Sequence, residues 1–265
     1  MDDIAAYLAR WPYDPESPYR VICGKDGRPK LQVRTPLGLL QFDLDGRPDG
    51  LRPSGAESLL DLWESRLAAY CVRHHTESGF SIPSGACADL CNEASLYYER
   101  YMSFFRTGDF ERAARDTGRN LRCLDLLARY AEDQEIRLGV ERYRANILQI
   151  NRASLAMLAV RRGQYDVALK EIDRGIRAVR GITSPDTPQL VRIRKRAVAF
   201  LKRLGKEIRL QRPVTRSEEL QKSLHEAVAT EDYERAAQLR DRLRLSESNL
   251  SRAIAPPRQA ADLRP

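Results

Sequence analysis

The spacing of apolar residues along the chain changes near residue 54. Before it, three short runs favour β-strands, at Tyr19–Cys23, Lys30–Arg34 and Leu39–Leu44. Lys-Asp-Gly and Pro-Leu-Gly sequences between them suit turns. The pattern therefore predicts a small antiparallel β meander over residues 1–53. Because so few strands cannot be stable alone, we expect one face of the meander to pack on the helices that follow.

From Ala56 onward the apolar residues recur at helical spacing. The first helix carries a stripe of Leu59, Leu60, Trp63, Leu67, Tyr70 and Cys71 and breaks near Gly79. The next helices are expected at 85–106, 110–131, 139–161, 165–180 and 187–211. Residues 54–212 are therefore predicted to form a helical bundle.

A short pattern recurs at three turns, beginning at Gly108, Gly163 and Glu231. Each turn is followed by an aromatic residue and an acid, with an alanine three residues after the aromatic. The acid suits a helix N-terminus, and the alanine lets the preceding helix approach. The first two hairpins resemble tetratricopeptide repeats, with Ala156 and Gly175 at the small-residue crossing of the second. The fold class predicted is mainly α, a tetratricopeptide-like helical hairpin bundle with a small N-terminal β unit.

Residues 213–250 predict a separate pair of short helices that turn at 230–232. Three features define the pair: an apolar face on the first helix, a matching stripe on the second, and Asp232 as the cap of the second helix. The face comprises Leu220, Leu224, Ala227 and Val228, and the stripe comprises Ala236, Leu239 and Leu243. A hairpin of roughly 35 residues has too little core for independent stability. It is therefore expected to dock on its own chain or on a partner, and residues 251–265 are expected to form a disordered tail.

This hairpin resembles the UVR domain, which the UvrB and UvrC subunits of bacterial excision repair share. The resemblance rests on the run Glu-Asp-Tyr-Glu-x-Ala-Ala-x-Leu-Arg-Asp over residues 231–241. It implies binding to another UVR hairpin or to a partner protein, such as an excision-repair subunit, a Clp-type ATPase or a second copy of the chain. The residues implied in protein binding are Leu224, Val228, Tyr233, Ala236, Ala237, Leu239, Arg240 and Asp241.

The resemblance does not extend to the enzymatic activities of UVR proteins. Helicase motifs, a nuclease signature and paired CxxC zinc ligands are absent from this sequence. A phosphate-binding Gly-rich loop, a nucleophile elbow and an HExxH motif are absent as well. With three histidines in the whole chain, an acid–base site has little support. We therefore expect a bacterial-type, non-enzymatic adaptor that uses no cofactor.

The positive charge of the chain is concentrated in one segment. The net charge is +8, and residues 190–216 contain ten basic residues against one acid, Glu207. Three interpretations remain open: a packed helix with a solvated basic face, a nucleic-acid surface, or contact with anionic lipid. In the alternative function, a nucleic-acid-associated accessory factor of DNA repair, the binding residues are Arg192, Arg194, Lys195, Arg196, Lys202, Arg203 and Lys206.

Two further constellations have a functional and a structural interpretation. Cys71, His74 or His75, Cys87 and Cys91 have spacings that a zinc site accepts, but buried free cysteine is also ordinary core material, and no metal is expected. Asn146, Gln149, Asn151, Arg152, Arg119 and Asn120 could line a peptide groove or bond to helix carbonyls.

The cellular compartment is inferred from cysteine usage and from the N-terminus. Five cysteines, an odd number, suit reduced thiols. The acidic start of the chain leads into no apolar segment of the signal-peptide type, and no run approaches the length of a membrane span. We therefore expect a cytoplasmic location.

Overall fold

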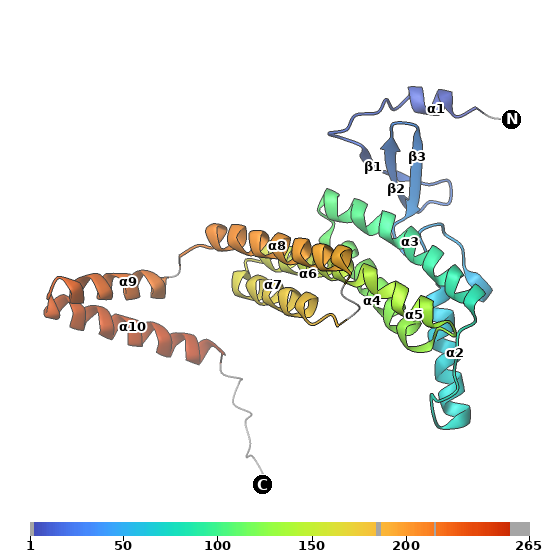
Figure 1. Cartoon of the computed structure of the whole chain (residues 1–265). Coiled ribbons are helices and arrows are strands. Elements are labelled where there is room, and N and C mark those ends of the chain that lie inside the picture. Colours follow the sequence, from blue (N-terminus) through green and yellow to red (C-terminus); the bar gives the residue numbers. More distant parts are fainter. Residues whose placement is uncertain (1–2, 184–186, 215, 255–265) are drawn as a thin grey trace, which may run out of the picture. The chain divides into compact units, whose positions relative to one another are not determined.

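The computed structural model describes residues 3–183, 187–214 and 216–254, although not the side chains of 216–218 and 245–254 (Figure 1). The chain divides into two compact units, Met1–Leu210 and Gln211–Pro265. The mainly helical fold class, the small N-terminal antiparallel sheet and the C-terminal helical hairpin are confirmed. The likeness of the first unit to tetratricopeptide repeats stays a prediction.

The first unit begins with a short helix and a three-stranded meander. Helix α1 (Ala5–Ala9) precedes strands β1 (Tyr19–Cys23), β2 (Pro29–Thr35) and β3 (Gly38–Asp43). Each strand pairs antiparallel with the next, in the order β1-β2-β3, as predicted. The expected boundary at residue 53 lies inside this first unit.

The expected packing of the sheet on the helices is confirmed. Leu31, Phe42 and Leu44 form one apolar cluster with Phe104 and Ala113 of the helices that follow. Two of these helices, α3 (Ser84–Thr107) and α4 (Phe110–Tyr130), therefore cover the sheet and exclude water from its inner face.

The helices of the first unit follow the predicted pattern with one exception. After a turn of 3-10 helix at Pro53–Gly55 come α2 (Leu59–His74), α3 (Ser84–Thr107), α4 (Phe110–Tyr130), α5 (Gln134–Val140), α6 (Arg144–Arg161), α7 (Tyr165–Arg180) and α8 (Pro188–Gln211). The helix expected at 139–161 was wrong at its start. Asp133 caps the separate helix α5, and a 3-10 turn at Glu141–Tyr143 joins α5 to α6.

The two predicted turns of this unit are confirmed by their backbone geometry. Gly108 and Gly163 adopt positive φ angles of 79° and 70°, which suit glycine because other residues are strained there. Asp109 caps α4 by accepting a hydrogen bond from the Arg112 N–H at 3.2 Å. Ala113 and Ala168, the alanines of the repeated pattern, are buried.

Two main apolar clusters lie under the helices. The first draws on α2, α3, α4, α5 and α6, and the second on α6, α7 and α8. At the second, a Cβ atom on Gly175 would meet the Arg152 Cβ at 2.8 Å and the Leu201 Cδ1 at 3.0 Å. Ala156 is also fully buried there. Small residues therefore allow these helices to approach closely, as the sequence predicts for Ala156 and Gly175.

A buried ion pair joins the sheet to α3 and α4. The Arg100 Nε and Nη2 donate to the two carboxylate oxygens of Asp116 at 2.7 and 3.0 Å, and both side chains are almost completely buried. The remaining Nη1 donates to the Asp43 carbonyl at the end of β3, at 2.7 Å. A single guanidinium thus ties three elements together through directional, charge-assisted hydrogen bonds.

A second buried pair lies two turns away on the same face of α3. Glu93 pairs with Arg119 of α4 and also accepts the backbone N–H groups of Leu59 and Leu60, at 2.8 and 3.3 Å. Arg47 approaches the same carboxylate at 3.3 Å. The negative charge therefore stabilises the N-terminus of α2, where the helix dipole favours an anion.

We expect Asp116→Ala to lower the free energy of unfolding of the first unit by about 3–5 kcal/mol, because it leaves the Arg100 charge buried without its partner. Urea denaturation followed by circular dichroism measures the change. Arg203→Gln is the control, since Arg203 and Glu207 form an exposed pair at 3.9 Å, and its effect should stay within about 1 kcal/mol. A loss below about 1 kcal/mol for Asp116→Ala would contradict a structural role for the pair.

Candidate functional site in the C-terminal hairpin and the basic groove

The second unit is a pair of helices, α9 (Arg216–Ala229) and α10 (Tyr233–Ile254), joined by a tight turn. Glu231 adopts a left-handed backbone with φ of 58°, and the Asp232 N–H donates back to the Ala227 carbonyl at 2.9 Å. Asp232 then accepts the Arg235 N–H at 3.1 Å, which confirms it as the cap of α10. Helix α10 includes residues 251–254 of the predicted tail, and residues 255–265 lie outside the described residues.

The core of this hairpin is small. Ala227, Ala236 and Leu239 are buried, and Leu220 and Leu224 pack against them. The short side chains at 227 and 236 let the two helices meet near the turn. Such a core removes little apolar surface from water, so the hairpin gains stability when another surface covers it.

The residues expected to bind protein fall into two groups. Leu224, Ala236 and Leu239 face the inside of the hairpin, and Ala237 is half-buried. Val228, Tyr233, Arg240 and Asp241 are exposed, Val228 by 52% and Tyr233 by 68%. The Arg240 Nε lies 3.9 Å from the Asp241 Oδ1. The first group therefore holds the hairpin together, and the second is available for contact.

Tyr233 is more exposed than the aromatic residues at the two upstream turns. Phe110 packs edge-on against Phe105 at 5.6 Å between ring centroids, and Tyr165 packs against the second apolar cluster. Tyr233 occupies the same place in the repeated pattern but has no such covering. Its ring is therefore a large, exposed aromatic group on the hairpin surface.

Comparison with protein families matches residues 217–248 to the UvrB/uvrC motif model. The chain carries a UVR motif. The match covers both helices and the turn between them, so the UVR hairpin and the second unit largely coincide. The search of curated proteins found no match, and neither did the search of solved structures.

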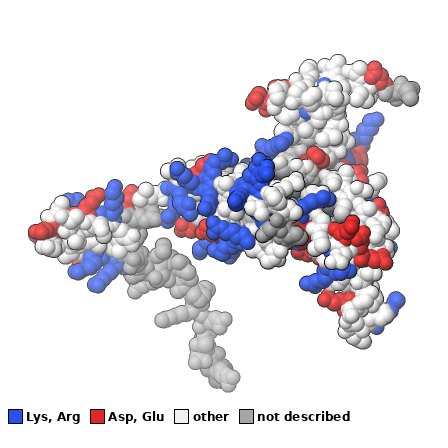
Figure 2. All heavy atoms as spheres, in the orientation of Figure 1, with Lys and Arg blue, Asp and Glu red and all other residues white. Residues whose placement is uncertain are grey.

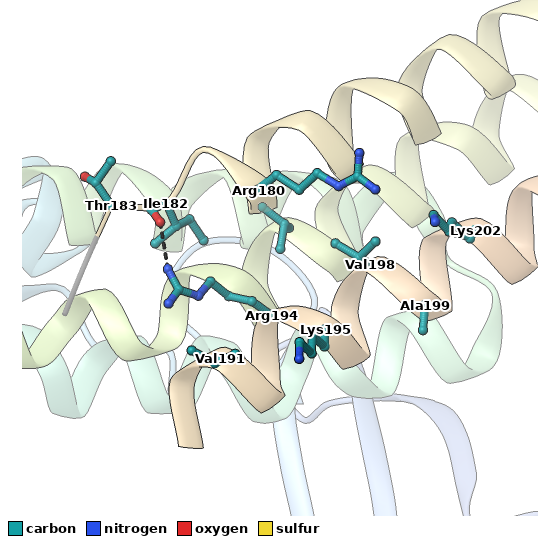
Figure 3. A pocket seen from close by; sticks show the side chains of 10 residues that line it. Arg180, Ile182, Thr183, Val191, Arg194, Lys195, Val198, Ala199 and Lys202 are labelled. Atoms are coloured by element: carbon teal, nitrogen blue, oxygen red, sulfur yellow. Dashed lines mark hydrogen bonds between the residues drawn. The ribbon is translucent and has the colours of Figure 1, made fainter. Parts of the chain in front are cut away.

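Outside the UVR hairpin, the basic segment forms one wall of a groove between α7 and α8 (Figure 3). The groove has a volume of about 580 Å³ and is lined by Arg180, Arg194, Lys195 and Lys202 together with apolar residues such as Val179 and Val198. The Arg194 Nη1 donates to the Ile182 carbonyl at 2.7 Å.

The structure brings three of the expected nucleic-acid-binding residues, Arg194, Lys195 and Lys202, into this groove. The other four are Arg192, Arg196, Arg203 and Lys206, and their side chains are exposed on α8. Arg180 of α7 lines the groove as well and was not among the residues expected from the sequence. The sequence feature that could have pointed to Arg180 is the basic last turn of α7, which contains Arg177 and Arg180.

Four of the six polar residues for which a peptide groove was one interpretation bond inside the bundle, in agreement with the structural interpretation. Asn151 donates to the Ala114 carbonyl at 3.1 Å, and Asn120 donates to the Ala94 carbonyl at 2.9 Å. Arg119 pairs with Glu93, while Arg152 pairs with Glu171 of α7 at 2.8 Å. These four side chains therefore pair with groups of neighbouring helices.

The cysteines and histidines of the suspected zinc site do not form a ligand cluster. No group of three or more histidine, cysteine or acidic side chains among the described residues could hold a metal ion. Cys87 is buried and lies 3.3 Å from the Ile82 carbonyl oxygen. The His74 ring lies against Tyr70, at 4.2 Å between centroids. All five cysteines are free thiols.

One structural centre was missed in the sequence, namely the buried charges of α3 and α4. Glu93 and Arg100 are seven residues apart and share a helix face with the buried Tyr97 and Phe104. Charged residues spaced at i and i+7 within an apolar stripe were the available signal.

No helix in the described part of the chain combines the length and apolar character of a membrane span.

Thiol chemistry offers a test of the burial of these cysteines. Burial raises the pKa of Cys87 to about 11 and that of Cys123 to about 12, so both stay protonated at neutral pH. Because thiolate is the reactive form, we expect each to react with iodoacetamide at pH 8 at least about a hundredfold more slowly than the exposed Cys23. Peptide mapping by mass spectrometry measures the rates, and urea-unfolded protein is the control. Equal labelling of Cys123 and Cys23 in native protein would contradict this assignment.

Proposed function

We propose that the protein is a cytoplasmic, non-enzymatic adaptor whose UVR hairpin binds another UVR-bearing protein or a second copy of the chain. The observation that supports it most directly is the UVR motif at residues 217–248, in a compact unit of its own. The exposed Val228 and Tyr233 give that unit an apolar contact surface next to its turn.

Physical reasoning about interfaces supports the same role. Tyrosine is enriched among the residues that dominate binding energy, because it brings a large apolar area with little side-chain entropy. The exposed Arg240 and Asp241 suit the polar rim that surrounds such an anchor. Two hairpins that cover each other in this way would also enlarge a core that is small in the single chain.

The partner class follows from the resemblance of the hairpin to UVR domains. We propose a UVR-bearing protein of the excision-repair or Clp-type ATPase class, with homodimers as the self-paired form. The non-enzymatic part of the proposal rests on the absence of catalytic motifs from the sequence. The alternative function, a nucleic-acid-associated accessory factor, uses the first unit and does not depend on the hairpin.

The double variant Val228→Lys with Tyr233→Asp tests the adaptor function in the full chain. Both side chains are exposed, and the new charges suit the C-terminus of α9 and the N-terminus of α10, so the hairpin should stay folded. We expect binding to weaken at least about thirtyfold, the loss typical of removing one anchor residue. Light scattering measures self-association, and capture by a purified UVR-bearing excision-repair subunit or Clp-type ATPase measures binding to a partner.

A matched variant separates this effect from a general change of surface. Val72→Lys with Tyr7→Asp exchanges one exposed valine and one exposed tyrosine of the first unit in the same way. It should bind as the unaltered chain does. The adaptor proposal fails if the hairpin variant binds as well as the matched variant does. It also fails if the unaltered chain binds neither a second copy nor either UVR-bearing probe.

A further inference from the structure

We propose that the α7–α8 face of the first unit binds the phosphate backbone of double-stranded nucleic acid without reading its sequence. The face consists of the groove lined by Arg180, Arg194, Lys195 and Lys202 and of the exposed basic side of α8. Lys and Arg side chains gather over α7 and α8 (Figure 2).

The basic residues of α8 form a continuous stripe along the helix. Lys195, Lys202, Lys206 and Arg209 are separated by seven, four and three residues and all are exposed, so they share one helix face. At 1.5 Å of rise per residue the stripe is about 21 Å long. That length matches roughly six base pairs of a duplex, over which each strand presents one phosphate every 3.4 Å.

The orientation of this stripe is determined by packing on the other side of α8. Ala197, Leu201 and Ile208 are fully buried, and a Cβ atom on Gly205 would come within 3.2 Å of the Ile172 Cγ2 of α7. The helix therefore cannot rotate to hide its basic side without exposing these residues. The cations are held on a rigid support, which reduces the entropy lost on binding.

A single acid on α8 itself opposes this charge. Glu207, the single acid between residues 190 and 211, lies 3.9 Å from Arg203. On α7, Glu171 is engaged by Arg152 and Arg174. Arg180, Lys195 and Lys202 form no ion pair within the part of the chain that the structure describes. In the close view, Arg180 extends from α7, while Lys195 and Lys202 lie on α8 (Figure 3).

The shape and composition of the face favour a duplex over other anions. No aromatic side chain is among the described residues that line the groove, so bases of a single strand would find no stacking partner there. A membrane-surface helix inserts its apolar side into lipid, but the apolar side of α8 is packed on α6 and α7. Phosphate contacts alone carry no sequence information.

Binding of the full chain to a fluorescent 30-base-pair duplex of mixed sequence, over a salt series from about 50 to 300 mM, tests the proposal. We expect a steep loss of affinity with salt, because phosphate binding releases counterions. The triple variant Lys195→Gln, Lys202→Gln, Lys206→Gln should reduce the slope of log K against log salt by about 3 and bind at least about tenfold more weakly at 100 mM salt.

Two control variants and two control probes make the outcome specific. Lys25→Gln, Arg73→Gln, Arg162→Gln removes three exposed charges elsewhere in the first unit and should leave binding within about twofold of the unaltered chain. The hairpin variant Val228→Lys with Tyr233→Asp should also leave it unchanged, which separates this surface from the proposed adaptor site. Equal losses in both triple variants would overturn the proposal. Duplex binding too weak to measure at 50 mM salt would also overturn it. The proposal would fail as well if the Lys195, Lys202 and Lys206 substitutions weakened binding to poly-glutamate or to phosphatidylserine vesicles but not to the duplex.

Discussion

The bidentate pair between Arg100 and Asp116 is the contact on which the first unit depends most. Apolar burial draws the sheet toward α3 and α4 but has no preferred direction, whereas the pair and the Arg100 bond to the Asp43 carbonyl set the position of the sheet. Glu93 does the same for the start of α2. Buried charges of this kind add little net stability, yet they penalise strongly any arrangement that separates them.

Local signals in the sequence predicted most of the elements but few of the polar contacts. The three strands, the turns at Gly108 and Gly163 and the Asp232 cap follow from residues that act on their immediate neighbours. Helix α5 and the turn at 141–143 were missed because a helix of seven residues is too short to show a clear helical spacing of apolar residues. The pairing of Glu93 with Arg119 joins residues 26 positions apart, and no local pattern specifies such a partner.

The two candidate sites were predictable to different degrees, because the sequence shows local patterns but not how helices pack on one another. The UVR hairpin is a local motif, so its turn and inner face were found from sequence, but the division between inward and exposed residues needed the structure. The charge of α8 was evident from composition, whereas the contribution of Arg180 depends on how α7 and α8 pack. The sequence left the role of Asn120 and Asn151 open, because a polar side chain near a helix crossing has the same sequence pattern whether it faces a ligand or a carbonyl.

The contact of Arg100 with Asp43 also bears on how this chain could be shortened or joined to others. Arg115 donates to the Leu44 carbonyl at 2.7 Å, so a cut at residue 53 would remove acceptors from two arginines and uncover Phe104. The N-terminal sheet is thus an inseparable part of the helical scaffold rather than a transferable module. A division near residue 210 would instead fall between the two compact units and would keep the apolar clusters inside each of them intact.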